Sequence, residues 1–112
     1  MKIINKGSFV PFIIYNNADT DKLRILKDNA KYTGIYQWKH IESGKIYIGS
    51  AINLKTRLSQ YFNINYLERN KSMYICNALR EHGYSAFSLS ILEYIDIVNL
   101  SKEEARKLVL ER

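Results

Sequence analysis

The sequence predicts an α/β domain of the α+β type, with a small, mainly antiparallel three-stranded sheet flanked by helices. Two short apolar and aromatic runs, at 34–39 and 45–50, are separated by a polar turn that contains Gly44. This pattern is typical of a β-hairpin, because glycine adopts the positive φ that such turns require. The segment 53–62 has the spacing of a helix, and a third apolar run at 87–95 supplies the remaining strand.

The N-terminal part precedes the hairpin and has a weaker pattern. Residues 1–18 carry apolar side chains without a helical period, which indicates an irregular or short-strand lead-in. A helix is expected over 20–28, with Thr20 or Asp21 as its cap and with Leu23 and Leu26, three apart, on one side.

The hairpin strands present aromatic residues. Strand alternation places Tyr36 and Trp38 on the same face of the sheet. Whether Tyr47 joins them depends on the pairing register of the two strands, which the pattern leaves open.

Two helices are expected after the hairpin. In the first, over 53–62, Leu54 and Leu58 mark the core face. A polar connection then leads to Ser72, a good N-cap for a helix through Glu81. The expected core residues of this second helix are Met73, Cys76 and either Leu79 or the apolar stem of Arg80.

The C-terminal third contains a strand and a last helix. We expect Gly83 to end the preceding helix in a left-handed cap. Both faces of the run 87–95 are partly apolar, which favours a central strand covered on both sides. A capping box that starts at Ser101 predicts a final helix to the terminus.

Composition narrows the class of protein. The chain has 112 residues, of which 46% are apolar and 25% charged, as in one globular domain. A net charge of +6 favours a polyanionic partner, although a merely basic soluble protein has the same charge.

Cys76 is the only cysteine, which excludes an internal disulfide and a cysteine-built zinc site. The apolar run 9–15 is too short to span a bilayer, and it lacks the small-residue cleavage site of a signal peptide and the arginine-rich pattern of a transit peptide, so we expect the protein to act in the compartment where it is made.

A set of short motifs surrounds the hairpin. They are Gly34-Ile35-Tyr36, Tyr47-Ile48-Gly49-Ser50, Arg57 eight residues past Gly49, and the run from Asn70 to Ser88 that includes His82-Gly83-Tyr84. On these residues the chain resembles the catalytic domain of the GIY-YIG endonucleases, and more narrowly those encoded in mobile group I introns, often mitochondrial ones. The resemblance implies a catalytic domain over 33–112, an N-terminal extension at 1–32 and a mitochondrial location.

The resemblance implies catalytic roles for four residues. Tyr47 is a candidate general base or a group that orients the nucleophile, with Tyr36 nearby. Arg57 contacts the scissile phosphate, for which its guanidinium offers fixed, paired donors. Tyr61 stands where members of the family carry a tyrosine or histidine that takes part in proton transfer. A tyrosine with a pKa of about 10 is a poor base unless cations lower that pKa, and Arg57 and a bound metal both act in this direction.

The resemblance also implies a divalent metal, Mg²⁺ or another ion, held by a glutamate on the helix after the third strand. Residues 108–112 match the part just before that glutamate, so we expect the ligand beyond Arg112 and a domain truncated at its C-terminal end. No metal ligand is assigned within the sequence. Glu111 lies about 200° around the helix from the expected position. His40 and His82 are too far apart in the sequence to form a metal motif.

Double-stranded DNA is the expected partner of a monomeric enzyme without membrane contact. The residues expected to contact it are Gly49, Ser50, Lys55, Arg69, Lys71 and Arg80. Each lysine or arginine contact adds about 0.9 to the salt slope of binding. Two functions agree with the pattern. One is a metal-dependent DNA endonuclease of the intron-homing type, and the other is a catalytically inactive nucleic-acid-binding module, such as a splicing helper.

Overall fold

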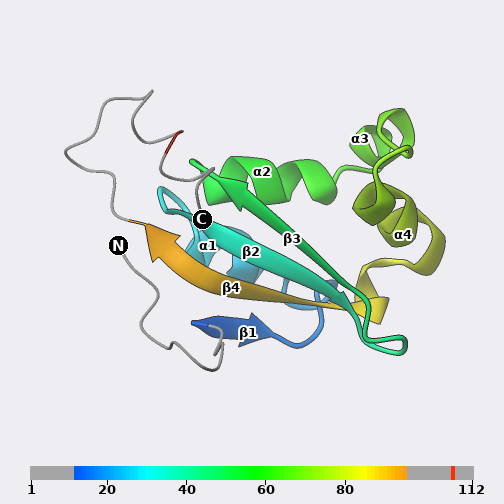
Figure 1. Cartoon of the computed structure of the whole chain (residues 1–112), viewed down its shortest axis with the longest axis horizontal. Coiled ribbons are helices and arrows are strands. Elements are labelled where there is room, and N and C mark those ends of the chain that lie inside the picture. Colours follow the sequence, from blue (N-terminus) through cyan, green and yellow to red (C-terminus); the bar gives the residue numbers. More distant parts are fainter. Residues whose placement is uncertain (1–11, 96–106, 108–112) are drawn as a thin grey trace.

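A four-stranded antiparallel sheet lies at the centre of the computed structural model, which describes residues 12–95 and residue 107 (Figure 1). The strands are β1 (Ile13–Tyr15), β2 (Thr33–His40), β3 (Ile46–Ala51) and β4 (Phe87–Ile95). They follow the spatial order β1-β4-β2-β3. The α+β class is confirmed, and so is the interior position of the strand over 87–95.

Strand β1 adds a fourth strand to the three that were predicted. It pairs antiparallel with β4, with Tyr15 opposite Leu89 and Ile13 opposite Ile91. The Tyr15 side chain is fully buried. Residues 13–15 of the predicted lead-in therefore belong to the sheet, where they pair with the edge of β4 that β2 leaves open.

Within residues 12–95, five helical segments lie between the strands. They are α1 (Lys22–Asp28), α2 (Leu54–Tyr61), α3 (Ile64–Arg69), α4 (Tyr74–His82) and the single-turn 3₁₀ helix η1 (Tyr84–Ala86). Figure 1 shows α2 lying along the sheet, with α3 and α4 beyond its C-terminal end. The predicted helix over 53–62 is confirmed, and Asn53 caps it by accepting a hydrogen bond of 3.1 Å from the Thr56 backbone N–H.

The pattern of α1 did not identify its buried residue, although Leu26 does pack against the core. Leu23 is 79% exposed, whereas Ile25 is fully buried. The helix has only seven residues and turns the side that carries Ile25 and the following Asn29 toward the sheet. A spacing of three between two leucines is too short a pattern to identify the buried face of such a helix.

The segment between α2 and β4 also differs from the prediction. The expected polar connection contains α3, which Asn63 caps and Leu67 anchors in the core. Helix α4 starts at Tyr74 without a side-chain cap, so Ser72 is not its N-cap. The later start turns Ile75 inward in place of the predicted Met73, which is 37% exposed.

Gly83 ends α4 with φ of 82° and ψ of 158°. The positive φ agrees with the prediction, but the extended ψ differs from a left-handed helical cap. Gly44 in the hairpin turn has φ of 77°, as expected. The predicted final helix from Ser101 lies outside the described residues apart from Lys107, which is helical.

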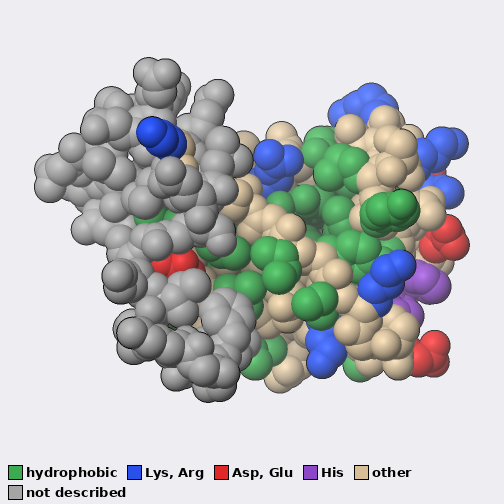
Figure 2. All heavy atoms as spheres, viewed as in Figure 1, with side chains coloured by type: hydrophobic (Ala, Val, Ile, Leu, Met, Phe, Trp, Pro, Cys, Tyr) green, Lys and Arg blue, Asp and Glu red, His purple; other side chains and the backbone are tan. Residues whose placement is uncertain are grey.

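The core lies mainly between the sheet and the helices. Its larger cluster includes Trp38, Leu54, Leu58, Leu79, Phe87, Leu89 and Ile91. A smaller cluster contains Ile35, Leu92 and Ile95, with Ile52 packed against it. In the part of the chain that is described, no helix is both long and apolar enough to cross a membrane. Figure 2 shows hydrophobic side chains gathered over β3 and toward α4, with lysine and arginine side chains beside them.

Candidate active site

The hairpin register places Tyr47 on the same face as Tyr36. Tyr36 pairs with Gly49, and Trp38 pairs directly with Tyr47. Directly paired residues of antiparallel strands project to the same face. Tyr47 is half-buried and packs against the larger core cluster, which contains both Tyr36 and Trp38. The register that the sequence left open therefore brings both motif tyrosines to the helix-covered face.

The glycines of both motifs permit close approaches. A Cβ at Gly49 would overlap the Tyr36 ring, with Cε1 at 2.9 Å and the hydroxyl oxygen nearer still. The Tyr36 side chain therefore lies directly against the Gly49 backbone. At Gly34 a Cβ would collide with the backbone carbonyl of Glu93 and come within 3.2 Å of Leu54 Cδ1. Packing thus explains both motif glycines. The absence of a side chain at Gly49 leaves the space that the Tyr36 ring occupies.

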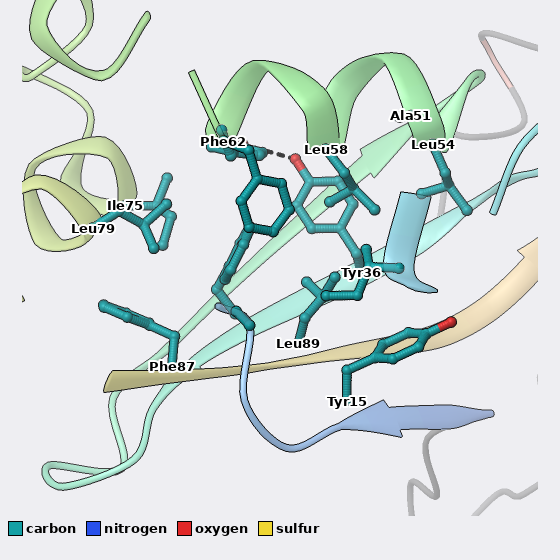
Figure 3. Close-up of a cluster of buried hydrophobic side chains, with 14 of the residues drawn as sticks. Tyr15, Tyr36, Ala51, Leu54, Leu58, Phe62, Ile75, Leu79, Phe87 and Leu89 are labelled. Atoms are coloured by element: carbon teal, nitrogen blue, oxygen red, sulfur yellow. Dashed lines mark hydrogen bonds between the residues drawn. The ribbon is translucent and has the colours of Figure 1, made fainter. Parts of the chain in front are cut away.

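Tyr36 and Tyr61 form a buried pair of phenols. Their hydroxyl oxygens are 2.8 Å apart, and either can donate the hydrogen bond. Each side chain is only 3% exposed. In Figure 3 the Tyr36 ring rises from β2 toward α2, next to Leu54 and Leu58. The Tyr84 hydroxyl donates a 2.7 Å hydrogen bond to the Tyr61 carbonyl, which ties the end of α2 to η1.

Burial decides the protonation of this pair. Desolvation raises the pKa of Tyr36 far above its ordinary value, and the neighbouring Tyr61 raises it further, while Arg57 only partly opposes this. Desolvation also raises the pKa of Tyr61, against smaller lowering effects from Tyr36 and Arg57. Arg57 therefore acts on both residues in the expected direction, but burial outweighs it and the net pKa of each tyrosine is raised. Near neutral pH they are uncharged hydrogen-bonding groups.

Arg57 lies in the middle of α2, where its side chain is half-buried. Its positive charge lowers the pKa values of Tyr36, Tyr61 and Cys76, so the guanidinium lies within electrostatic reach of all three groups. No described acidic residue forms an ion pair with it. This guanidinium is therefore available for an anionic ligand beside the phenol pair.

The residues expected to contact DNA differ in how exposed they are and in which protein groups they contact. Gly49 and Ser50 are half-buried in β3, whereas Lys55, Arg69 and Lys71 are exposed. Arg80 donates a hydrogen bond of 3.1 Å to Asn77 and pairs with Glu68 at 3.6 Å. Its charge is thus partly neutralised within the protein, unlike that of the other basic residues in this group.

The structure brings together two histidines that the sequence separates. The His40 and His82 ring centroids are 4.4 Å apart, and both rings contact Phe87. His40 Nδ1 also shares a 2.8 Å hydrogen bond with Ser43 Oγ. This contact joins the hairpin turn to the end of α4. It depends on long-range pairing of β2 with β4, which no local pattern reveals.

The described residues do not provide a recognisable set of ligands for a divalent metal. Among residues 12–95 and 107, no three histidine, cysteine, aspartate or glutamate side chains cluster in a way that would hold an ion. Glu93 is buried within β4, opposite Ile35 in the β2 register. Glu111 and the expected ligand position lie outside the described residues. The described residues alone therefore do not complete a metal site.

The fold and the site together define a small α+β domain in which a hairpin and the following helix bring three motif tyrosines to one face of the sheet, with Arg57 on the same helix as Tyr61. Comparison with known protein families identifies the class more closely. Residues 32–108 match the GIY-YIG catalytic domain. The chain belongs to this family.

Individual relatives share this part of the chain. The chain is 39% identical over 63 residues to UvrABC system protein C of Prochlorococcus marinus (strain MIT 9312), an alignment that covers 55% of this chain and 10% of the relative. It is 36% identical over 66 residues to UvrABC system protein C of Mycoplasmopsis agalactiae (strain NCTC 10123 / CIP 59.7 / PG2), covering 50% of this chain and 12% of the relative. The alignments thus span about a tenth of the length of these curated relatives.

A solved structure is also similar. It is a point mutant of the catalytic domain of intron endonuclease I-TevI, with a TM-score of 0.47 and 31% identity. The alignment covers 71% of this chain and 82% of that one.

Proposed function

We propose that this domain is a DNA endonuclease that hydrolyses phosphodiester bonds. The observation that carries the proposal is the buried Tyr36–Tyr61 hydroxyl pair on the face that also holds Tyr47, together with the half-buried Arg57, whose positive charge lowers the pKa of both buried tyrosines. Membership of the GIY-YIG catalytic domain family supports the same reaction. We extend the proposal to intron homing, double-stranded DNA, a monomeric enzyme and a mitochondrial location, on the resemblance to intron-encoded members.

Arg57 binds the scissile phosphate in this proposal. A guanidinium donates two parallel hydrogen bonds to phosphate oxygens and remains charged at all working pH values. It offsets the negative charge that builds up as water attacks phosphorus. Loss of a positioned donor of this kind typically slows an enzyme by about 10²- to 10³-fold.

The three tyrosines divide into two groups. Tyr36 and Tyr61 are uncharged near neutral pH, so they act as hydrogen-bonding groups and not as bases. Tyr47 is half-buried at the edge of the core, which leaves its hydroxyl to orient the attacking water. A divalent metal, Mg²⁺ in our proposal, would lower the pKa of that water when bound.

Plasmid nicking tests the proposal. A chain extended past Arg112 should convert supercoiled plasmid to the nicked form in the presence of Mg²⁺, and Arg57→Ala in that chain should reduce the rate by about 10²-fold or more. Lys27→Ala, a change of an exposed basic residue on α1, is the matched control and should cut at the wild-type rate. DNA binding without nicking in Mg²⁺ or Mn²⁺ would instead support the alternative, a catalytically inactive nucleic-acid-binding module.

A further inference from the structure

Lys45 lies between two tyrosine rings that come from distant parts of the sequence. Its Nζ is 5.8 Å from the centroid of the Tyr47 ring and 5.9 Å from the centroid of the Tyr74 ring. Both distances fall in the range of a cation–π contact, which extends to about 6 Å. The hairpin turn and the start of α4 therefore meet at one ammonium group.

The Tyr74 ring contributes little to the core. It is the first residue of α4 and is 81% exposed, more than any other large hydrophobic residue in the described part of the chain. No described aromatic ring stacks on it. Its faces are therefore open to a planar partner, apart from the side that Lys45 approaches.

This aromatic and basic surface continues into the candidate active site. Tyr47 is the proposed water-orienting residue, and it stands two positions before Gly49, across which Tyr36 lies. Figure 2 shows the hydrophobic side chains over β3 and toward α4 with positively charged side chains among them. A DNA strand bound at the candidate active site thus has an ammonium group and an exposed ring next to Tyr47.

We propose that Tyr74 and Lys45 form a stacking platform for an unpaired nucleobase of the DNA strand bound at the active site, an inference that rests on the proposed function. Every nucleobase has a π face that stacks on an exposed aromatic ring, and the ammonium group attracts the adjoining phosphate. The charge of the chain, +6, is complementary to this partner. The substrate then carries an unstacked nucleotide next to the scissile phosphate.

Binding to two single strands tests the platform without requiring catalysis. Fluorescence anisotropy compares a labelled oligonucleotide with an abasic strand of the same length, which keeps the phosphates but lacks bases. Tyr74→Ala should weaken binding of the ordinary strand roughly tenfold and leave the abasic strand unchanged. Lys45→Ala should weaken both strands and reduce the salt slope by about 0.7.

Two further variants serve as controls. Tyr74→Phe keeps the ring and should bind like wild type, while Leu23→Ala removes an equally exposed side chain on α1 and should change neither affinity. An unchanged urea midpoint for Tyr74→Ala verifies the fold. Wild-type affinity of Tyr74→Ala for the ordinary strand, equal losses on both strands, or a loss in Tyr74→Phe as large as in Tyr74→Ala would each overturn the platform. A chain that shows the Tyr74 effect but never nicks plasmid supports the platform and refutes the proposed nuclease.

Discussion

Gly49→Ala should destabilise the domain through its contact with Tyr36. The new Cβ would lie 2.9 Å from Tyr36 Cε1 and nearer still to the hydroxyl, so the ring must move. Overpacking of this kind costs about 1–3 kcal/mol, and loss of the Tyr36–Tyr61 hydrogen bond adds roughly 0.5–1.5 kcal/mol. The free energy of unfolding should therefore fall by about 2–4 kcal/mol, a large share of the 5–15 kcal/mol that is usual for a domain.

Urea denaturation followed by circular dichroism measures this loss. Gly44→Ala is a comparison in open space, because no atom lies within 4 Å of its Cβ and only the strain of φ at 77° remains. It should cost about 1 kcal/mol. In a Tyr36→Leu background the Gly49→Ala penalty should shrink, since the ring that it meets is gone. A Gly49→Ala protein within about 0.5 kcal/mol of wild type would refute this reading of the motif glycine.

Three further predictions concern buried groups. Asn29→Ala removes the side chain that bonds the Tyr15 and Tyr94 hydroxyls at 3.2 and 2.6 Å, and urea unfolding should show a loss of about 1–3 kcal/mol. Burial raises the pKa of Tyr15 and of Tyr84 to about 12, so the folded state keeps protons that the unfolded state releases above about pH 10. These groups should leave the urea midpoint independent of pH up to about pH 10 and should make it fall between about pH 10 and pH 12. A urea midpoint that rises over this range would contradict the assignment. Cys76 is fully buried and its pKa is raised by burial, so a thiol reagent should modify it slowly until denaturant is added, and rapid labelling of the native chain would contradict its placement.

Local patterns were sufficient for the hairpin, for α2 and for the interior position of β4. Each of these rests on a period or a turn residue within a few positions, such as Leu54 and Leu58 on α2 or Gly44 in the turn. The pairing of β1 with β4 was not predictable in this way. It joins three residues near the start of the chain to a strand at its far end, and no nearby residue encodes that contact.

The candidate site also combines features that local patterns predict with features that depend on long-range contacts. Arg57 and Tyr61 were placed together because they lie four residues apart on one helix. The face on which Tyr47 lies can be predicted only from the hairpin register. The contact between Tyr36 and Gly49 can be seen only in the three-dimensional structure. The raised pKa values of Tyr36 and Tyr61 could not be predicted either, because they result from tertiary burial.

A double-mutant cycle of Arg57→Ala and Tyr47→Phe on the single-turnover rate of DNA cleavage tests the central claim most directly, because both residues are proposed to act on one phosphate. Residues that act as a unit lose activity together, so we predict that the double variant is about as slow as the slower single variant. A double variant whose rate loss equals the product of the two single losses would mean that Arg57 and Tyr47 act independently, and would contradict a shared site.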